Sequence, residues 1–138
     1  MVAIDTARKQ ARTCGTQSMP AATPWKANVK LGAAAEMHAE DMAKMGTLTH
    51  TGSGGGVAKD WAGKQGYTAS LALDLVYGST NEPTAQQVVS AWLATPQDCA
   101  LIMNTSYGLV DAGVGMAQKS NATGTQMKYY VSVVVAKP

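Results

Sequence analysis

The feature that most constrains the fold is an amphipathic segment, about residues 27–45, that ends at a glycine. Its apolar residues recur at helical spacing, with charged residues between them: Leu31, Ala35, Met42 and Met45. Gly46 supplies the left-handed residue that commonly stops a helix. The following THTGSGGG is too rich in glycine, serine and threonine for a regular element, so it predicts a loop. His50 in this loop is therefore expected at the surface or in a cleft.

The remaining segments predict alternating helices and strands. Helices are expected at about residues 3–12, 57–64 and 83–94, and strands at about residues 71–77, 110–117 and 128–136. Pro83 suits the first turn of its helix, and the run CALIM is expected to form a further short helical segment. This order predicts one domain over residues 1–138 with an α/β (α+β) fold, a three-layer α-β-α sandwich around a mainly antiparallel sheet.

Composition argues against a nucleic-acid partner and against a membrane-spanning segment. The net charge is +2 and only 14% of residues are charged, so the chain lacks the basic surface that nucleic-acid binding requires. No apolar run approaches the thickness of a bilayer, so no transmembrane segment is expected. The first residues, MVAID, carry no signal peptide. We expect a monomer.

Several short motifs occur in an order typical of one family. They are ARKQARTCG near the N-terminus, AAEMHAEDMA followed by HTGS, the Gly66-Tyr67 pair, VVSAWLATPQDCALIMN, a Gly113-Val114-Gly115 turn and a closing YYVSVVVAKP. In this order and spacing the chain resembles the bacterial branch of the CAP superfamily. That superfamily comprises secreted domains related to cysteine-rich secretory proteins, antigen 5 and plant pathogenesis-related proteins of class one. The resemblance covers nearly the whole chain and implies the same α-β-α sandwich.

Two cysteines, Cys14 and Cys99, are the only ones in the chain. Their spacing alone leaves open whether they pair, although no metal-type C-x-x-C pattern is present. The resemblance implies that they form a disulfide, because similar bacterial members bridge these two positions. It also implies a secreted protein, extracellular or periplasmic, whose natural precursor carries a signal peptide.

The resemblance further implies a cleft with two histidines and one or two glutamates, a donor set that can hold zinc. His50 corresponds to the first histidine. The second belongs to a segment that is TPQDC in this chain, where Asp98 replaces it. The family glutamate falls on Asp74 when counted forward from Gly66-Tyr67, and on Leu73 when counted back from Gly78. The cleft residues of this chain are thus His50, Asp98 and Asp74.

These residues also have structural interpretations. His50 is expected to form a hydrogen-bonded ion pair with Asp98, alone or together with Asp74, that raises its pKa, or alternatively to ligate a metal. Asp98 fits a capping box, Thr95-Pro96-Gln97-Asp98, that opens a short helix. His38 lies on the apolar stripe of its helix and is predicted to be a core residue.

Three functions remain open on this basis. The first is a secreted binding or interaction domain whose cleft has lost its metal-type residues, without a cofactor and with an extracellular partner. The second is a carrier of a sterol or another apolar lipid, because some family members bind lipids. The third is a metal-assisted hydrolase that uses His50, with zinc as its cofactor. The chain shows no nucleophile with a base beside it, which favours a function without catalysis.

Overall fold

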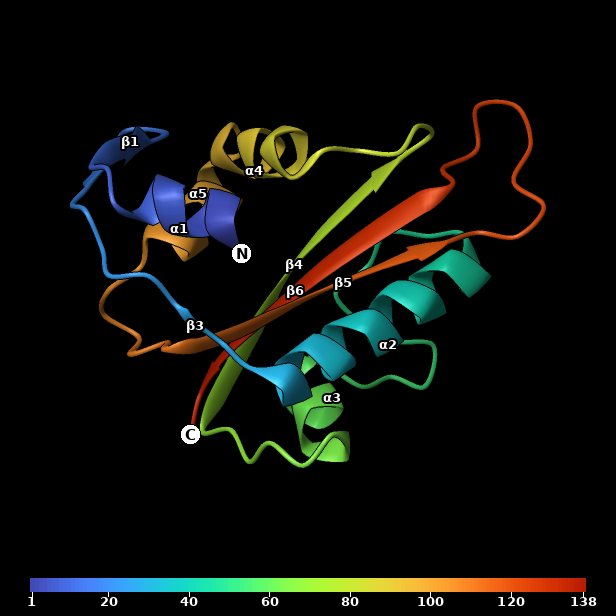
Figure 1. Cartoon of the computed structure of the whole chain (residues 1–138), viewed down its shortest axis with the longest axis horizontal. Coiled ribbons are helices and arrows are strands. Elements are labelled where there is room, and N and C mark those ends of the chain that lie inside the picture. Colours follow the sequence, from blue (N-terminus) through green and yellow to red (C-terminus); the bar gives the residue numbers. More distant parts are fainter.

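The computed structural model describes residues 1–138 and contains five helices and six strands (Figure 1). The helices are α1 (Val2–Arg8), α2 (Val29–Met45), α3 (Ala58–Lys64), α4 (Ala85–Leu93) and α5 (Pro96–Met103). The strands are β1 (Arg12–Cys14), β2 (Gln17–Met19), β3 (Lys26–Ala27), β4 (Leu71–Ser79), β5 (Asp111–Gln118) and β6 (Tyr129–Lys137). None of the helices has the length and apolar content needed to traverse a lipid bilayer.

A four-stranded sheet in the order β3-β5-β6-β4 separates two layers of helices (Figure 1). The long strands β4, β6 and β5 are antiparallel to their neighbours, and only the short β3 is parallel to β5. One apolar core joins the sheet to α1, α4 and α5, and a second joins its other face to α2 and α3. The predicted three-layer α-β-α sandwich is therefore confirmed.

The central strand β6 explains why the C-terminal sequence is apolar at nearly every position. Val131, Val133 and Val135 face the core beneath α1, α4 and α5. Val134 and Ala136 face the core beneath α2 and α3. A strand covered on both faces has no solvent side, so its sequence shows a continuous apolar run in place of alternation.

Gly113 and Gly115 lie within β5, as the strand predicted over about residues 110–117 requires, and they do not form a turn. Both face α2, which crosses the sheet directly over them. A Cβ atom at Gly113 would fall within 3.0 Å of the backbone of Gly32, and one at Gly115 would do so at Glu36. Glycine is used here because helix and strand backbones approach too closely for any side chain.

The predicted helix boundaries need three corrections. The first helix ends at Arg8, because residues 12–19 form the β1-β2 hairpin. Pro83 precedes α4, whose N-cap is Thr84, and the Thr84 hydroxyl and the Gln87 side chain form a capping box there. The capping box predicted at Thr95 is absent, because the Thr95 hydroxyl donates to the Ala91 carbonyl instead.

Cys14 and Cys99 form the disulfide that the family resemblance implies. Their Cα atoms lie 5.5 Å apart, within the ordinary range for a bridge. The bond joins β1 to α5, and both half-cystines are buried. It thereby holds the N-terminal hairpin against the helix that carries Asp98.

Candidate functional site

The loop after α2 places His50 against strand β4. Its Nδ1–H donates to Oδ2 of Asp74 at 2.9 Å. The His50 side chain is 59% exposed and that of Asp74 is 10% exposed, so a surface imidazole meets a nearly buried carboxylate. The hydrogen bond that His50 donates to Asp74 raises the pKa of His50 against the opposing effect of partial burial. Asp74, and not Leu73, therefore supplies the carboxylate beside His50.

Asp98 lies in the first turn of α5 and acts on His50 through space. The two side chains form no hydrogen bond, although the charge of Asp98 contributes to the raised pKa of His50. Burial raises the pKa of Asp98 itself against the opposing charge of His50, and the neighbouring Asp74 charge adds to the rise. The direct pairing of His50 with Asp98 that the sequence suggested is thus replaced by pairing with Asp74.

His38 is buried beneath the same loop, as the apolar stripe of α2 predicted. Its ring stacks on Trp61 of α3, with the ring centroids 3.7 Å apart. Its Nε2–H donates to the Thr49 carbonyl at 2.7 Å, and burial lowers its pKa, which favours the neutral ring. His38 therefore fixes the backbone next to His50. Its Nδ1 is buried and has no hydrogen-bond partner.

A second contact that the sequence analysis missed closes the glycine-rich end of this loop. Asp41 of α2 accepts hydrogen bonds from the backbone N–H and the hydroxyl of Ser53, at 2.7 and 2.6 Å. Burial alone would raise the pKa of Asp41, but these bonds outweigh it and lower the pKa. The only signal in the sequence was that Asp41 follows His38 by three residues, which places both side chains on neighbouring helical positions.

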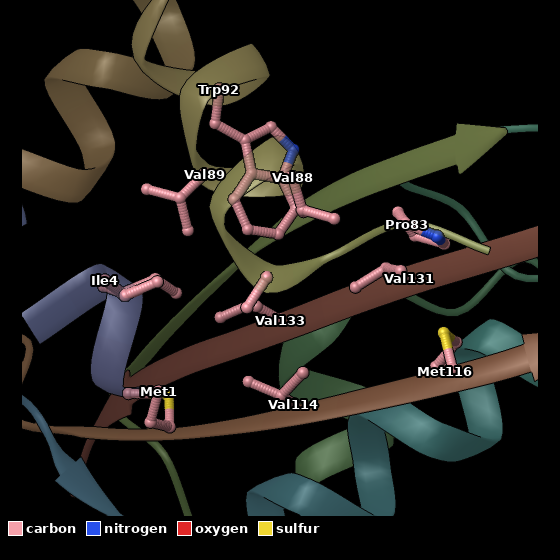
Figure 2. Close-up of a pocket in the computed structure, with 12 residues that line it drawn as sticks. Met1, Ile4, Pro83, Val88, Val89, Trp92, Val114, Met116, Val131 and Val133 are labelled. Atoms are coloured by element: carbon pink, nitrogen blue, oxygen red, sulfur yellow. The ribbon is translucent and has the colours of Figure 1, made fainter. Parts of the chain in front are cut away.

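Two cavities of different character lie on the two faces of the sheet. A polar cleft of about 660 Å³ between α2, α3 and residues 52–56 is lined by Asp41, Asp60, Trp61 and their neighbours. An apolar pocket of about 240 Å³ lies between α1, α4 and the sheet (Figure 2). In Figure 2, Val114 and Met116 of β5 point into it from below and Trp92 of α4 closes it from above. His50, Asp74 and Asp98 line neither cavity.

The residues around His50 do not fit a zinc site. No group of three or more His, Cys, Asp or Glu side chains lies close enough together to hold a metal ion. Nδ1 of His50 is engaged by Asp74, which leaves Nε2 as its one available donor, and the only other imidazole, His38, is buried and bonded to the backbone. A structural zinc site needs four donors and a catalytic site three, usually with more than one nitrogen or sulfur.

Comparison with known proteins assigns the family. The model of the CAP, cysteine-rich secretory protein family matches residues 3–135. The chain belongs to the CAP family. An outer surface protein of Borrelia burgdorferi has a similar structure, with a TM-score of 0.65 and 18% identity over 83% of this chain and 78% of that one. An extracellular protein containing an SCP domain from Bacillus anthracis matches with a TM-score of 0.63 and 16% identity, over 82% of this chain and 34% of that one. No curated protein matches.

The raised pKa of His50 in this CAP domain can be tested by removing the carboxylates that raise it. In proton NMR titrations, Asp74→Asn should lower the His50 pKa toward the ordinary value of about 6.5. Asp98→Asn should lower it less, because Asp98 acts only through space. Since the folded pKa lies above the unfolded one, the pair stabilises the fold fully below the unfolded pKa, and this contribution is lost as pH rises through the folded pKa.

His38 can be followed in the same spectra: burial lowers its pKa and Asp74→Asn removes none of its hydrogen bonds, so the variant should change its pKa only through the lost Asp74 charge, which raises that pKa in wild type. Equal His50 pKa values in wild type and Asp74→Asn would contradict the ion pair. A larger fall in Asp98→Asn than in Asp74→Asn would assign the pairing to Asp98.

Proposed function

We propose that this chain is a secreted CAP-family binding domain, extracellular or periplasmic, that recognises its partner without catalysis. The observation that carries the proposal is the engagement of His50 by Asp74, with Asp98 where a second histidine would stand. The cleft has therefore lost the paired imidazoles of a metal centre, while the fold that presents it is retained. The alternative of a metal-assisted hydrolase has less support, because Nε2 of His50 would need further metal donors beside it, and no group of three or more His, Cys, Asp or Glu side chains gathers there.

Calorimetry with Zn²⁺ tests this proposal. Titration of wild type and His50→Ala with zinc chloride at neutral pH should give the same heat, because His50 contributes no metal site. His38→Asn, which removes the other imidazole, is the matched control for histidine-dependent heat. A saturable heat that His50→Ala abolishes, accompanied by zinc-dependent ester hydrolysis with the same dependence, would establish the hydrolase.

The apolar pocket supports a second candidate function, the carriage of a sterol or other apolar lipid. All but one of its twelve lining residues are hydrophobic, and two of them, Val114 and Met116, are exposed to solvent. These two side chains are 41% and 42% exposed, which is unusual for neighbouring apolar residues on one strand face. Apolar pockets of this kind bind ligands mainly by excluding water.

Dodecanoate is a suitable probe for this candidate. Calorimetry should detect its binding to wild type, and Val114→Trp should weaken that binding by on the order of tenfold because the indole occupies the pocket mouth. Val57→Trp adds the same side chain at a residue outside the pocket that is 48% exposed, and should bind as wild type does. Equal affinity for all three proteins would place the fatty acid elsewhere.

A further inference from the structure

One half of strand β5 lies at an open edge of the sheet. β3 pairs with β5 only through Lys26 and Ala27, and the Asn28 N–H donates to the Ala112 carbonyl at the end of this pairing. Backbone groups along a strand point alternately to its two sides. The N–H and C=O groups of Val114 and Met116 therefore face the same side as Ala112, where no strand continues. These groups have no partner within the chain.

The opposite edge of the sheet, along β4, is protected. The indole N–H of Trp92 donates to the outward carbonyl of Val76 at 2.9 Å. The His50 loop crosses the same strand, where His50 bonds the side chain of Asp74. Natural proteins usually block exposed edges in such ways, because an unpaired edge is a template for another strand. The unprotected half of β5 thus differs from the rest of the sheet.

The side chains around this edge specify what would pair with it. On one face, Val114 and Met116 are about two-fifths exposed and border the apolar pocket (Figure 2). On the other face, α2 lies directly over Gly113 and Gly115, and it carries Glu36 beside Gly115. Glu40 follows one turn later and lines a hollow with Ala117 and Gln118 of β5.

Next to Val114 and Met116, this second face of the sheet carries negative charge. Glu36 and Glu40 are exposed and neither has a cationic nitrogen within 4.0 Å, since the only salt bridge in the chain is His50 with Asp74. Lys44 and Lys119 border the far end of the hollow, where the Lys119 ammonium donates to the Ala43 carbonyl. A strand added beside Val114 and Met116 would therefore have an apolar surface on one face and two unpaired carboxylates on the other.

We propose that the open edge of β5 binds an extended peptide segment of a partner protein, with alternating apolar and basic residues. Its backbone pairs with Val114 and Met116, its apolar side chains pack at the pocket mouth, and its basic side chains meet Glu36 and Glu40. This proposal rests on the proposed binding function and names its class of partner. A second copy of the chain fits less well, because edge-to-edge pairing would bring two α2 helices, each with both carboxylates, alongside one another.

Amide hydrogen exchange tests the proposal one residue at a time. The probe is a short synthetic peptide of alternating valine and lysine, acetylated and amidated at its ends. At saturating peptide, NMR should show exchange at the Val114 and Met116 amides slowed by more than about tenfold. The Gly113 and Gly115 amides already face β6 and should change little. Methylation of the peptide nitrogens that face β5 should abolish the effect, whereas methylation of the alternate nitrogens should preserve it.

Charge variants supply the control. The double variant Glu36→Lys/Glu40→Lys should weaken peptide binding by on the order of tenfold or more. Glu82→Lys reverses another exposed carboxylate, in the loop before α4, and should bind as wild type does. Absence of peptide binding, or binding that leaves the Val114 and Met116 amides unprotected, would overturn the proposal. So would protection that rises with protein concentration without peptide, because it would identify a second copy as the occupant.

These outcomes are separate from those that test the proposed function. A failure of the peptide to bind would leave the zinc titration of His50→Ala unchanged. A His50-dependent zinc site would contradict the function without affecting exchange at β5.

Discussion

Gly115→Ala is expected to destabilise the fold by about 3 kcal/mol or more, one of the largest effects of any single substitution in the chain. The added methyl group would meet the backbone of Glu36 and Ala35, which cannot rotate away as a side chain can. Either α2 must lift from the sheet or β5 must bend, and both changes open the core beneath Leu31 and Ala35. Denaturant unfolding followed by circular dichroism measures the loss as a lower midpoint.

Gly63→Ala is the matched control. Gly63 lies inside α3, and a Cβ atom there would have no neighbour within 4 Å. The same substitution should therefore stabilise this protein by about 0.5–1 kcal/mol, because alanine favours a helix over glycine. If Gly115→Ala unfolds at the wild-type midpoint, then α2 does not lie directly against β5.

Removal of the Cys14–Cys99 disulfide is expected to have an effect of similar size. The bridge closes a loop with a sequence separation of 85 residues. The chain-entropy model assigns such a loop about 4–5 kcal/mol of stability at 25 °C. The double variant Cys14→Ala/Cys99→Ala should lose about that amount in denaturant unfolding, which is a large share of the stability of an ordinary domain.

Reduction of the wild-type protein provides the comparison for this variant. Wild type unfolded in the presence of a phosphine reductant should match the double variant, and the reductant should leave the variant unchanged. Because both half-cystines are buried, reduction of the native protein should be slow and should require transient opening of β1 from α5. A double variant as stable as oxidised wild type would show that the reduced chain is already restrained by the hairpin.

The sequence predicted the long elements well, because each has a strong local signal. The stripe from Leu31 to Met45 and the stop at Gly46 located α2, and the apolar run after Lys128 located β6. The short strands β1, β2 and β3 were missed. They span three, three and two residues and depend on pairing with distant partners, which no local pattern encodes.

The candidate site was predicted only in part. His50 and Asp74 were both identified, but the choice between Asp74 and Leu73 required the strand register, because a shift of one residue reverses the face of a strand. The stacking of His38 on Trp61 and the bonds from Ser53 to Asp41 join residues from separate elements. Such contacts depend on tertiary packing and leave no signature in the order of the residues.

The position of β6 has a consequence for how the chain folds. This strand follows every other helix and strand, and both β4 and β5 pair with it. During synthesis, the sheet therefore lacks its centre until β6 leaves the ribosome. Before then β4 has no paired strand, and β5 has only the two-residue β3. Contacts between distant segments form slowly. We expect the nascent chain to stay largely unfolded during translation, which is the state in which general secretion carries a polypeptide across a membrane.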